Sequence, residues 1–290
     1  MTRIALITGS SRGVGAATAR RLAAADHDVV VTYRTDRAAA ATVADDVCRL
    51  GRRAWVRALD LEDESAIQET FEWMASDIGQ LDVLVANAAR TTFRPLVDCR
   101  RYHLERTFAT SVFGFHSMVM GALPLLAADR GQIVVVSGCD VDTWIPGHGG
   151  LAAAKAALDT MVKYLACELG ELGVSIVGVN PGWVSTDSLK LMLGGQFDDL
   201  HRAECATHPR RAAAEPEDVA RCIEHLLADR SGWLSGQTIR VDGGGSFSYG
   251  GRYMMMAGDR ASTDRENAGG RDGVDNDARP ELEPIPGGAV

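Results

Sequence analysis

The stretch ITGSSRGVGAATARRL occupies residues 7–22 and decides the fold class of this chain. It continues an apolar run at residues 4–8, and in its second half Val14, Thr18 and Leu22 fall on one face of a helix. Glycines between a strand and a helix permit a tight turn and let a phosphate group approach the amino end of the helix closely. The stretch therefore predicts a β-α unit whose connecting turn binds a dinucleotide.

Short apolar runs alternate with helical segments along most of the chain. The runs that predict strands lie at residues 4–8, 29–33, 54–58, 83–86, 133–137, 175–179 and 238–241. Apolar residues recur at helical spacing over residues 14–22, 37–50, 64–78, 102–126, 151–172 and 215–228. Buried strands joined by helices are typical of parallel sheets. The sequence predicts an α/β protein, a single-domain Rossmann fold with a doubly wound parallel sheet and helices on both faces.

Two segments depart from this alternation. Residues 187–214 carry a glycine pair, two histidines and mixed charge, which predicts a helical insertion or lid. Residues 247–290 are rich in glycine, proline and charges of both signs but poor in aliphatic side chains. This composition predicts a largely disordered tail, with one packed piece at residues 249–256. The expected organisation is a domain over residues 1–246, including the lid, followed by the tail.

Charge and cysteine usage exclude several classes of protein. The chain has 30 basic and 39 acidic side chains and a formal net charge of −9, which disfavours binding to nucleic acid. No apolar run approaches the ~18 residues of a membrane span, and the start lacks the apolar stretch of a secretory signal. The six cysteines are scattered, without a Cys/His cluster, so no metal site is expected. We expect a cytoplasmic protein with reduced thiols that acts on a small molecule.

Further motifs follow the glycine turn in order along the chain. They are Asp60-Leu61, Asn87-Ala88-Ala89, NPGWVST at residues 180–186, and SGQT at 235–238 leading to VDGG at 241–244. Together they resemble the short-chain dehydrogenase/reductase family, most closely its 3-oxoacyl-carrier-protein reductase-like branch. Ala89 stands where that family has Gly. The resemblance runs from the first residues to about Gly245.

The resemblance implies an oxidoreductase that binds a nicotinamide dinucleotide. In the family, the Asp60-Leu61 position contacts adenine, and the segment at residues 180–186 holds the nicotinamide carboxamide. The cofactor-binding residues implied are Gly9, Ser11, Arg12, Gly13, Val14, Gly15, Arg34, Asp60, Leu61, Asn87, Ala88, Lys155, Pro181, Gly182, Val184 and Thr186.

The end of the second predicted strand favours NADP(H) over NAD(H). An NAD site places an Asp or Glu about 20 residues past the glycine turn, where the acid binds the ribose hydroxyls. This chain has Tyr33-Arg34 there, and Arg12 lies in the glycine turn. Two guanidinium groups are suited to a 2′-phosphate. The alternative is that both are simply exposed and solvated.

The catalytic pattern of the family is only partly present. There, a Tyr four residues before a Lys donates a proton, and the Lys holds the cofactor ribose and lowers the Tyr pKa. A Ser thirteen residues before the Tyr polarises the substrate oxygen, and an Asn on an earlier helix anchors a water. Here Lys155 is present, but Leu151 takes the Tyr position, Gly138 the Ser position and Phe108 the Asn position.

Without a positioned acid, carbonyl reduction slows by ~10²–10⁴-fold, because hydride transfer to a ketone leaves an alkoxide. We therefore expect poor reduction of simple ketones and activity on an activated C=N or C=C bond. Enoyl reductases, a divergent branch of the family, place their Tyr seven residues before the Lys, a position held here by His148. Because histidine exchanges protons near neutral pH, His148 is a candidate catalytic residue. Lys155, which matches the Lys of the family pattern, is the other.

The surroundings of His148 leave alternatives open. His148 stands among glycines, and the alternative to a catalytic role is that it is a solvated loop residue. Asp140 and Asp142 are expected to be loop or helix-cap residues, and Cys139 a small buried hydrophobe.

Three functional hypotheses follow. The first is a reductase of a small metabolite. The second is a cyclase, isomerase or dehydratase that retains the cofactor as a structural element, and the third is a non-catalytic subunit paired with an active homologue. The family associates through two long helices, here at residues 102–126 and 151–172. A homodimer or homotetramer is therefore expected, or a hetero-oligomer under the third hypothesis.

Overall fold

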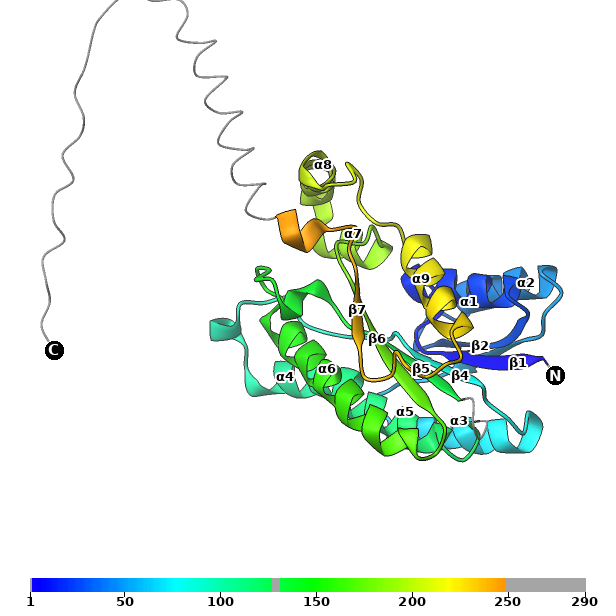
Figure 1. Cartoon of the computed structure of the whole chain (residues 1–290). Coiled ribbons are helices and arrows are strands. Elements are labelled where there is room, and N and C mark those ends of the chain that lie inside the picture. The colour runs from blue at the N-terminus through cyan, green and yellow to red at the C-terminus, as the bar shows by residue number, and fades with distance from the viewer. Residues whose placement is uncertain (1, 127–130, 249–290) are drawn as a thin grey trace, which may run out of the picture. The chain divides into compact units, whose positions relative to one another are not determined.

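The computed structural model describes residues 2–126 and 131–248 (Figure 1). Within these residues, seven strands form one sheet in the order β3-β2-β1-β4-β5-β6-β7. The strands are β1 (Arg3–Ile7), β2 (His27–Tyr33), β3 (Ala54–Ala58), β4 (Val83–Ala86), β5 (Gln132–Val136), β6 (Ser175–Pro181) and β7 (Thr238–Val241). All neighbouring strands are parallel. The predicted fold class is confirmed, and strand ends differ from the predictions by one or two residues.

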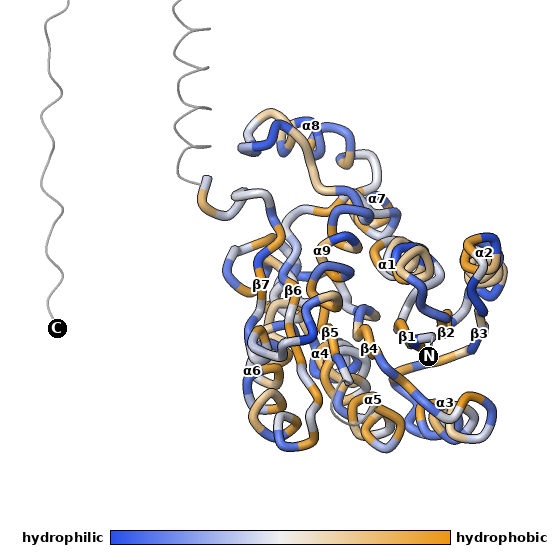
Figure 2. The backbone as a smooth tube through the Cα atoms, turned by 45° about the vertical axis from the view of Figure 1, so that its right-hand side comes forward, coloured by the Kyte–Doolittle hydropathy of each residue, from blue (hydrophilic) through white to orange (hydrophobic). Residues whose placement is uncertain are grey.

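Helices cover both faces of the sheet (Figure 1). One layer contains α1 (Gly13–Ala24), α2 (Arg37–Arg49) and α9 (Pro216–Ala228), and the other contains α3 (Glu64–Asp77), α5 (Gly114–Ala122) and α6 (Gly149–Gly170). Each layer buries its own apolar cluster against the sheet, with Leu22 and Ile223 on the first face and Met74 and Met118 on the second. Figure 2 shows hydrophobic residues along the central strands, between the two layers.

The helix predicted over residues 102–126 is present but changes its hydrogen-bond pattern within its length and ends earlier. It consists of α4 (Arg101–Phe108), a π-helical segment (Ala109–Phe113) and α5, which ends at Ala122. At the start of α5, a Cβ on Gly114 would lie 2.5 Å from the Leu61 carbonyl oxygen, so the helix approaches the end of β3 closely. Pro124 follows the last turn and has no N–H to continue the helix. The prediction of a long helix is confirmed as far as Ala122, but the π-helical segment was not predicted, because periodicity does not register a change of hydrogen-bond pattern.

The predicted lid is helical. It contains α7 (Asp187–Leu193), a 3-10 turn (Gly194–Gln196) and α8 (Phe197–Thr207), none of which has a fully buried residue. Three further 3-10 turns lie at Leu96–Asp98, Cys139–Val141 and Gly245–Ser248. The predicted tail and its packed piece at 249–256 lie outside the described residues, so the domain boundary at 246 stays a prediction.

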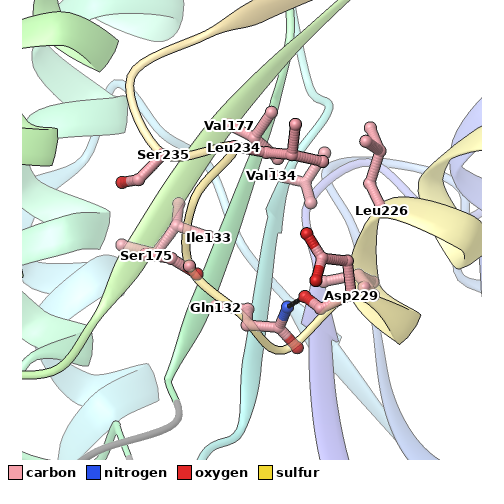
Figure 3. A pocket seen from close by; sticks show the side chains of 11 residues that line it. Gln132, Ile133, Val134, Ser175, Val177, Leu226, Asp229, Leu234 and Ser235 are labelled. Carbon is pink, nitrogen blue, oxygen red and sulfur yellow. Dashed lines mark hydrogen bonds between the residues drawn. The ribbon is translucent and has the colours of Figure 1, made fainter.

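A cavity of about 10 Å³ lies at the amino ends of β5 and β6, where Gln132 and Ser175 line it (Figure 3). Gln132 Nε2 donates a hydrogen bond to the Asp229 carbonyl oxygen at 2.9 Å across this end of the sheet. Ligands in doubly wound folds bind at the opposite, carboxyl ends of the strands. In the described part of the chain, no helix is both long and apolar enough to cross a bilayer.

Candidate active site

The candidate site lies at the carboxyl ends of the central strands. The strand order reverses between β1 and β4, and ligands bind in the crevice outside such a reversal. The glycine turn follows β1, and Asn87 and Ala88 follow β4. His148 and Lys155 come after β5 along the chain. The topology therefore brings together the residues predicted to bind a cofactor and the two predicted to be catalytic.

The glycine turn has a shape that requires glycine. Gly9 and Gly13 have φ angles of +64° and +56°, in the left-handed region that other residues rarely adopt. A Cβ on Gly15 would lie 2.5 Å from the Gly9 carbonyl oxygen and 2.7 Å from Asn87 Nδ2. The backbone of α1 therefore packs directly against the turn after β4.

Hydrogen bonds join the turns after β1 and β4. Thr8 Oγ1 accepts from the Asn87 and Ala88 N–H groups at 2.9 and 3.0 Å. Asn87 Nδ2 donates to the Thr8 carbonyl oxygen at 3.0 Å. The polar side chains at this edge thus hold the two turns in fixed positions.

The first turn of α1 is open to an anion. Arg12 is its N-cap and gives no side-chain cap, so the first N–H groups, at Gly13 and Val14, have no capping acceptor. These N–H groups and the helix dipole favour a phosphate. The start of the lid lies alongside, because a Cβ on Gly13 would lie 3.8 Å from Thr186 Cγ2. With Ser11 in the turn, this cradle fits the diphosphate of a dinucleotide.

The end of β2 carries the second predicted arginine. The Gly9 N–H donates to Thr32 Oγ1 at 3.1 Å, which holds the end of β2 beside the glycine turn. Arg12 and Arg34 are both exposed at this edge. Neither side chain has a hydrogen-bond or ion-pair partner within residues 2–126 and 131–248, so both guanidinium groups are free to bind an anion.

The remaining predicted cofactor contacts lie at neighbouring strand ends. Leu61 is buried just after β3, where Asp60 Oδ1 accepts from the Glu62 N–H at 3.0 Å. The segment at the end of β6 carries Pro181, Gly182, Val184 and Thr186. These positions complete a line of contacts along the carboxyl edge of the sheet.

Lys155 lies on the buried side of α6 and is 5% exposed. Its Nζ donates to the carbonyl oxygen of Val136 at the end of β5. Burial lowers the pKa of Lys155 to about 8, although the nearby carboxylates of Asp140 and Asp159 act in the opposite direction. The ammonium group is therefore held at the strand ends.

Asp140 and His148 form a pair beside this lysine. Asp140 Oδ2 lies 3.3 Å from His148 Nδ1, and the two side chains are 5% and 14% exposed. Phe93 contacts the imidazole with its ring centroid 4.9 Å away. His148 Nε2 is buried and has no hydrogen-bond partner among the described residues. The Asp140 carboxylate thus contacts Nδ1 of the ring, and Nε2 has no hydrogen-bond partner among the described residues.

The structure corrects two expectations about this loop. Asp140 is a loop residue, as predicted, but its side chain is buried against His148, and the His148 side chain is only 14% exposed rather than solvated. Asp142, by contrast, is half-exposed in an ion pair with Arg240. Sequence analysis missed the role of Asp140 because its contact with His148 depends on the tertiary path of the loop. The one signal in the sequence was the glycine at position 138. In the structure, a Cβ on Gly138 would lie 2.5 Å from Asp140 Oδ1.

Other candidates around the pair lack reactive side chains. Burial, together with nearby carboxylates, raises the pKa of Cys139 to about 11, so its thiol stays protonated and unreactive. Leu151 is partly buried in the first turn of α6, and Phe108 packs near Phe113 with ring centroids 6.5 Å apart. Within residues 2–126 and 131–248, no cluster of three or more metal-ligating side chains is present.

Comparison with known proteins identifies similar sequences over most of the chain. A family described as Enoyl-(Acyl carrier protein) reductase matches residues 9–246. A 1-cyclohexenylcarbonyl-CoA reductase of Streptomyces collinus is 31% identical over 242 residues, which are 83% of this chain and 86% of that protein. A versicolorin reductase of Emericella nidulans is 31% identical over 251 residues, covering 83% and 95% of the two chains.

A solved structure shares both fold and sequence. It is a short chain dehydrogenase from Burkholderia cenocepacia J2315 in complex with NADP, with a TM-score of 0.76 and 30% identity. The match covers 84% of this chain and 98% of that one. The similarity spans the glycine turn, the loop of Asp140 and the lid, and stops before the tail.

Proposed function

The chain belongs to the short-chain dehydrogenase/reductase family and is an oxidoreductase, and on that premise we propose that it uses NADPH to reduce an activated C=C or C=N bond, with His148 as the proton donor. The Asp140–His148 pair beside Lys155 is the observation that carries this proposal. It provides acid–base groups where Leu151 and Gly138 provide none.

Residues at the strand ends are suited to hold the cofactor. The open first turn of α1 faces the diphosphate, and Lys155 binds the nicotinamide ribose. Arg12 and Arg34, both without a partner among the described residues, bind the 2′-phosphate, which is why NADP(H) is preferred to NAD(H). When bound, NADPH supplies the hydride.

The proton step is assigned to His148. Its Nε2 has no hydrogen-bond partner among the described residues, so we assign this nitrogen to the proton transfer. Leu151, in the Tyr position of the family pattern, has no proton to give. His148 lies seven residues before Lys155, the spacing at which enoyl reductases of this family carry their Tyr.

An activated double bond is the substrate that suits this site. Hydride addition to a C=C bond conjugated with a carbonyl gives an enolate, and addition to an iminium gives a neutral amine, so neither leaves an isolated alkoxide. The 31% identical relative is named for 1-cyclohexenylcarbonyl-CoA, a conjugated thioester, and the matching family is described as an enoyl reductase. Both similarities support a conjugated C=C bond.

The test measures NADPH oxidation with matched substrates: a 2-enoyl thioester, a cyclic iminium and a 3-oxoacyl thioester. We expect the enoyl thioester or the iminium to react on the order of 100-fold faster than the ketone, because the ketone lacks its usual acid. His148→Ala should abolish reduction of the enoyl thioester, whose enolate needs a proton, and should leave reduction of the iminium, which needs none, unchanged. Equal or faster reduction of the 3-oxoacyl thioester would overturn the proposal.

The same pair of side chains favours a second candidate function. A cyclase, isomerase or dehydratase needs an acid–base group and no net hydride transfer, and Asp140 with His148 supplies one. The two functions differ in cofactor turnover: deuterium from 4-deuterated NADPH appears in the product of a reductase and not in that of an isomerase. A non-catalytic subunit would consume no substrate and would co-purify with an active homologue.

We also propose a homodimer or homotetramer formed through α4–α5 and α6. Large apolar side chains are exposed along these helices, with Phe113 63%, Met120 49% and Tyr164 67% exposed. Exposed apolar groups of this size indicate a protein interface. Light scattering measures the assembly, and a monomer at micromolar concentration would contradict it.

A further inference from the structure

We propose that Asp140 is the positioning residue for His148: its carboxylate accepts the Nδ1–H of the ring and leaves Nε2 as the atom that exchanges the proton. The proposal rests on the proposed function for the use made of that proton. It adds a residue that the family pattern does not contain, and it assigns the tautomer of the ring.

The carboxylate occupies the space of a missing side chain. Asp140 lies in the 3-10 turn directly after β5, and its Oδ1 is 2.5 Å from the position that a Cβ on Gly138 would take. A Cβ at position 138 would require the end of the Asp140 side chain to turn away from this position. Glycine at 138 and a buried carboxylate at 140 therefore belong together as one arrangement.

Two contacts position the imidazole, and a third holds the loop that carries it. Asp140 Oδ2 lies 3.3 Å from Nδ1, which is longer than an ideal charge-assisted hydrogen bond and within the range seen in catalytic pairs before substrate binds. Phe93 packs against the ring and restricts its rotation. The loop itself is held because the Arg94 N–H donates to the Gly147 carbonyl oxygen at 2.9 Å.

Charge in the site agrees with this orientation. Asp140 lies close enough to Lys155 to raise the pKa of the lysine, against the lowering by burial. An ionised carboxylate can only accept a hydrogen bond, so the ring must donate through Nδ1. Neutral His148 then carries its hydrogen on Nδ1.

The proton balance is simple. In the reduction of a conjugated C=C bond, the Nε2–H bond of the imidazolium would break and its proton would pass to the α-carbon of the enolate, while the cofactor of the proposed function would supply the hydride. The ring becomes neutral and keeps the Nδ1–H bond to Asp140. Solvent then returns a proton to Nε2 before the next turnover.

The test reads the tautomer without substrate or cofactor. In protein labelled with ¹⁵N, ring nitrogen shifts distinguish Nδ1–H from Nε2–H, and the signal of His148 among the seven histidines is assigned from its absence in His148→Ala. We expect the neutral ring to be in the Nδ1–H form. In Asp140→Asn, the carboxamide can donate to Nδ1, so the Nε2–H form should appear.

Asp142→Asn is the matched control, because Asp142 lies in the same loop but pairs with Arg240. It should leave the tautomer and the turnover unchanged. Asp140→Asn should lower kcat by ~10²–10⁴-fold with KM nearly constant, because substrate binding is retained and proton delivery is lost.

An Nε2–H ring in the unmodified protein overturns the proposal, and this measurement does not depend on whether any variant folds. A His148 tautomer that is the same in Asp140→Asn and the parent also overturns it. Failure of the proposed function has a different signature, because NADPH would then go unoxidised by every substrate while the tautomer is measured independently.

Discussion

A side chain at position 138 and the Asp140 carboxylate compete for one space. The family pattern suggests that Gly138→Ser with Leu151→Tyr would restore ketone reduction, but the serine Cβ would lie 2.5 Å from Asp140 Oδ1. We therefore expect little gain from this double variant. Adding Asp140→Ala should raise NADPH oxidation with a 3-oxoacyl thioester at least ~10-fold over the double variant, within the range of acid catalysis. Phe108 is unchanged, so recovery should be partial. An equal gain without Asp140→Ala would show that the carboxylate moves aside freely.

Arg34 has no other partner in the described residues, so its removal tests cofactor preference cleanly. Arg34→Ala should weaken NADPH binding by about 10–100-fold, because a charge-assisted hydrogen bond to phosphate contributes ~1.5–3 kcal/mol. NADH binding should not change. Fluorescence titration measures both, with Arg221→Ala on the exposed side of α9 as the control. Equal affinities of the unmodified protein for NADPH and NADH would contradict the assignment.

Lys155 is expected to destabilise the cofactor-free protein in the charged form. Burial lowers its pKa from 10.5 to about 8, so between these values the unfolded chain binds more protons than the folded one. Stability from this group therefore rises with pH across that window, by up to about 3 kcal/mol, and is constant below it. We expect urea unfolding from pH 7 to 10 to show that the free energy of unfolding of the parent rises relative to that of Lys155→Met. Parallel stability profiles would contradict the lowered pKa.

Residue identity along the chain predicts some of these roles and misses others. The glycine turn and Lys155 are recognisable because each is fixed by local spacing within one β-α unit. Asp140 is not, because its partner is reached through a loop that folds back over eight residues, and because a carboxylate after a strand is more often a cap.

At the scale of elements, the inner strands are predicted closely because they are mostly buried and read as continuous apolar runs, whereas the edge strands β3 and β7 are only partly buried. The position of the helix at residues 102–126 is predicted, but the change in its hydrogen-bond pattern is not. Its π-helical segment, Ala109–Phe113, changes the hydrogen-bond pattern while the apolar side chains stay near helical spacing. Phe108 is the last residue of α4, immediately before this segment.

Gly114 allows α5 to pack closely against the chain after β3, directly after the π-helical segment. Gly114→Ala would bring a Cβ to 2.5 Å from the Leu61 carbonyl oxygen and 2.7 Å from the Leu61 Cβ, which are backbone or near-backbone atoms. We expect a destabilisation of about 1–3 kcal/mol. Gly170→Ala is the control, since it lies at the end of α6 with no atom within 4 Å of the added methyl group, and should be neutral or slightly stabilising. Equal midpoints in urea for the two variants would contradict the close approach of α5 to β3.

At the scale of the whole molecule, two apolar clusters on opposite faces of one sheet account for the stability of the fold. The buried apolar residues run from Ile4 to Leu227, and β7 then completes the edge of the sheet beside β6. The carboxyl ends of the strands remain for the site. The division is typical of doubly wound folds, in which the core fixes the strands and the loops supply the chemistry.

A chain that ends after Tyr253 should therefore keep both fold and NADPH affinity. The segment that follows is rich in glycine, proline and charge and has too few aliphatic side chains to bury a core of its own. Its loss should change the melting midpoint by less than about 2–4 °C, the shift that ~1 kcal/mol produces in a domain of this size. A chain ending after Leu234 is the control: it lacks β7, whose backbone pairs with β6 from Gly178 to Pro181, and should melt much lower. Thermal melts with and without NADPH measure both chains. If the chain ending at Tyr253 also melts much lower, or loses the stabilisation by NADPH, the removed segment packs on the domain or on a second copy.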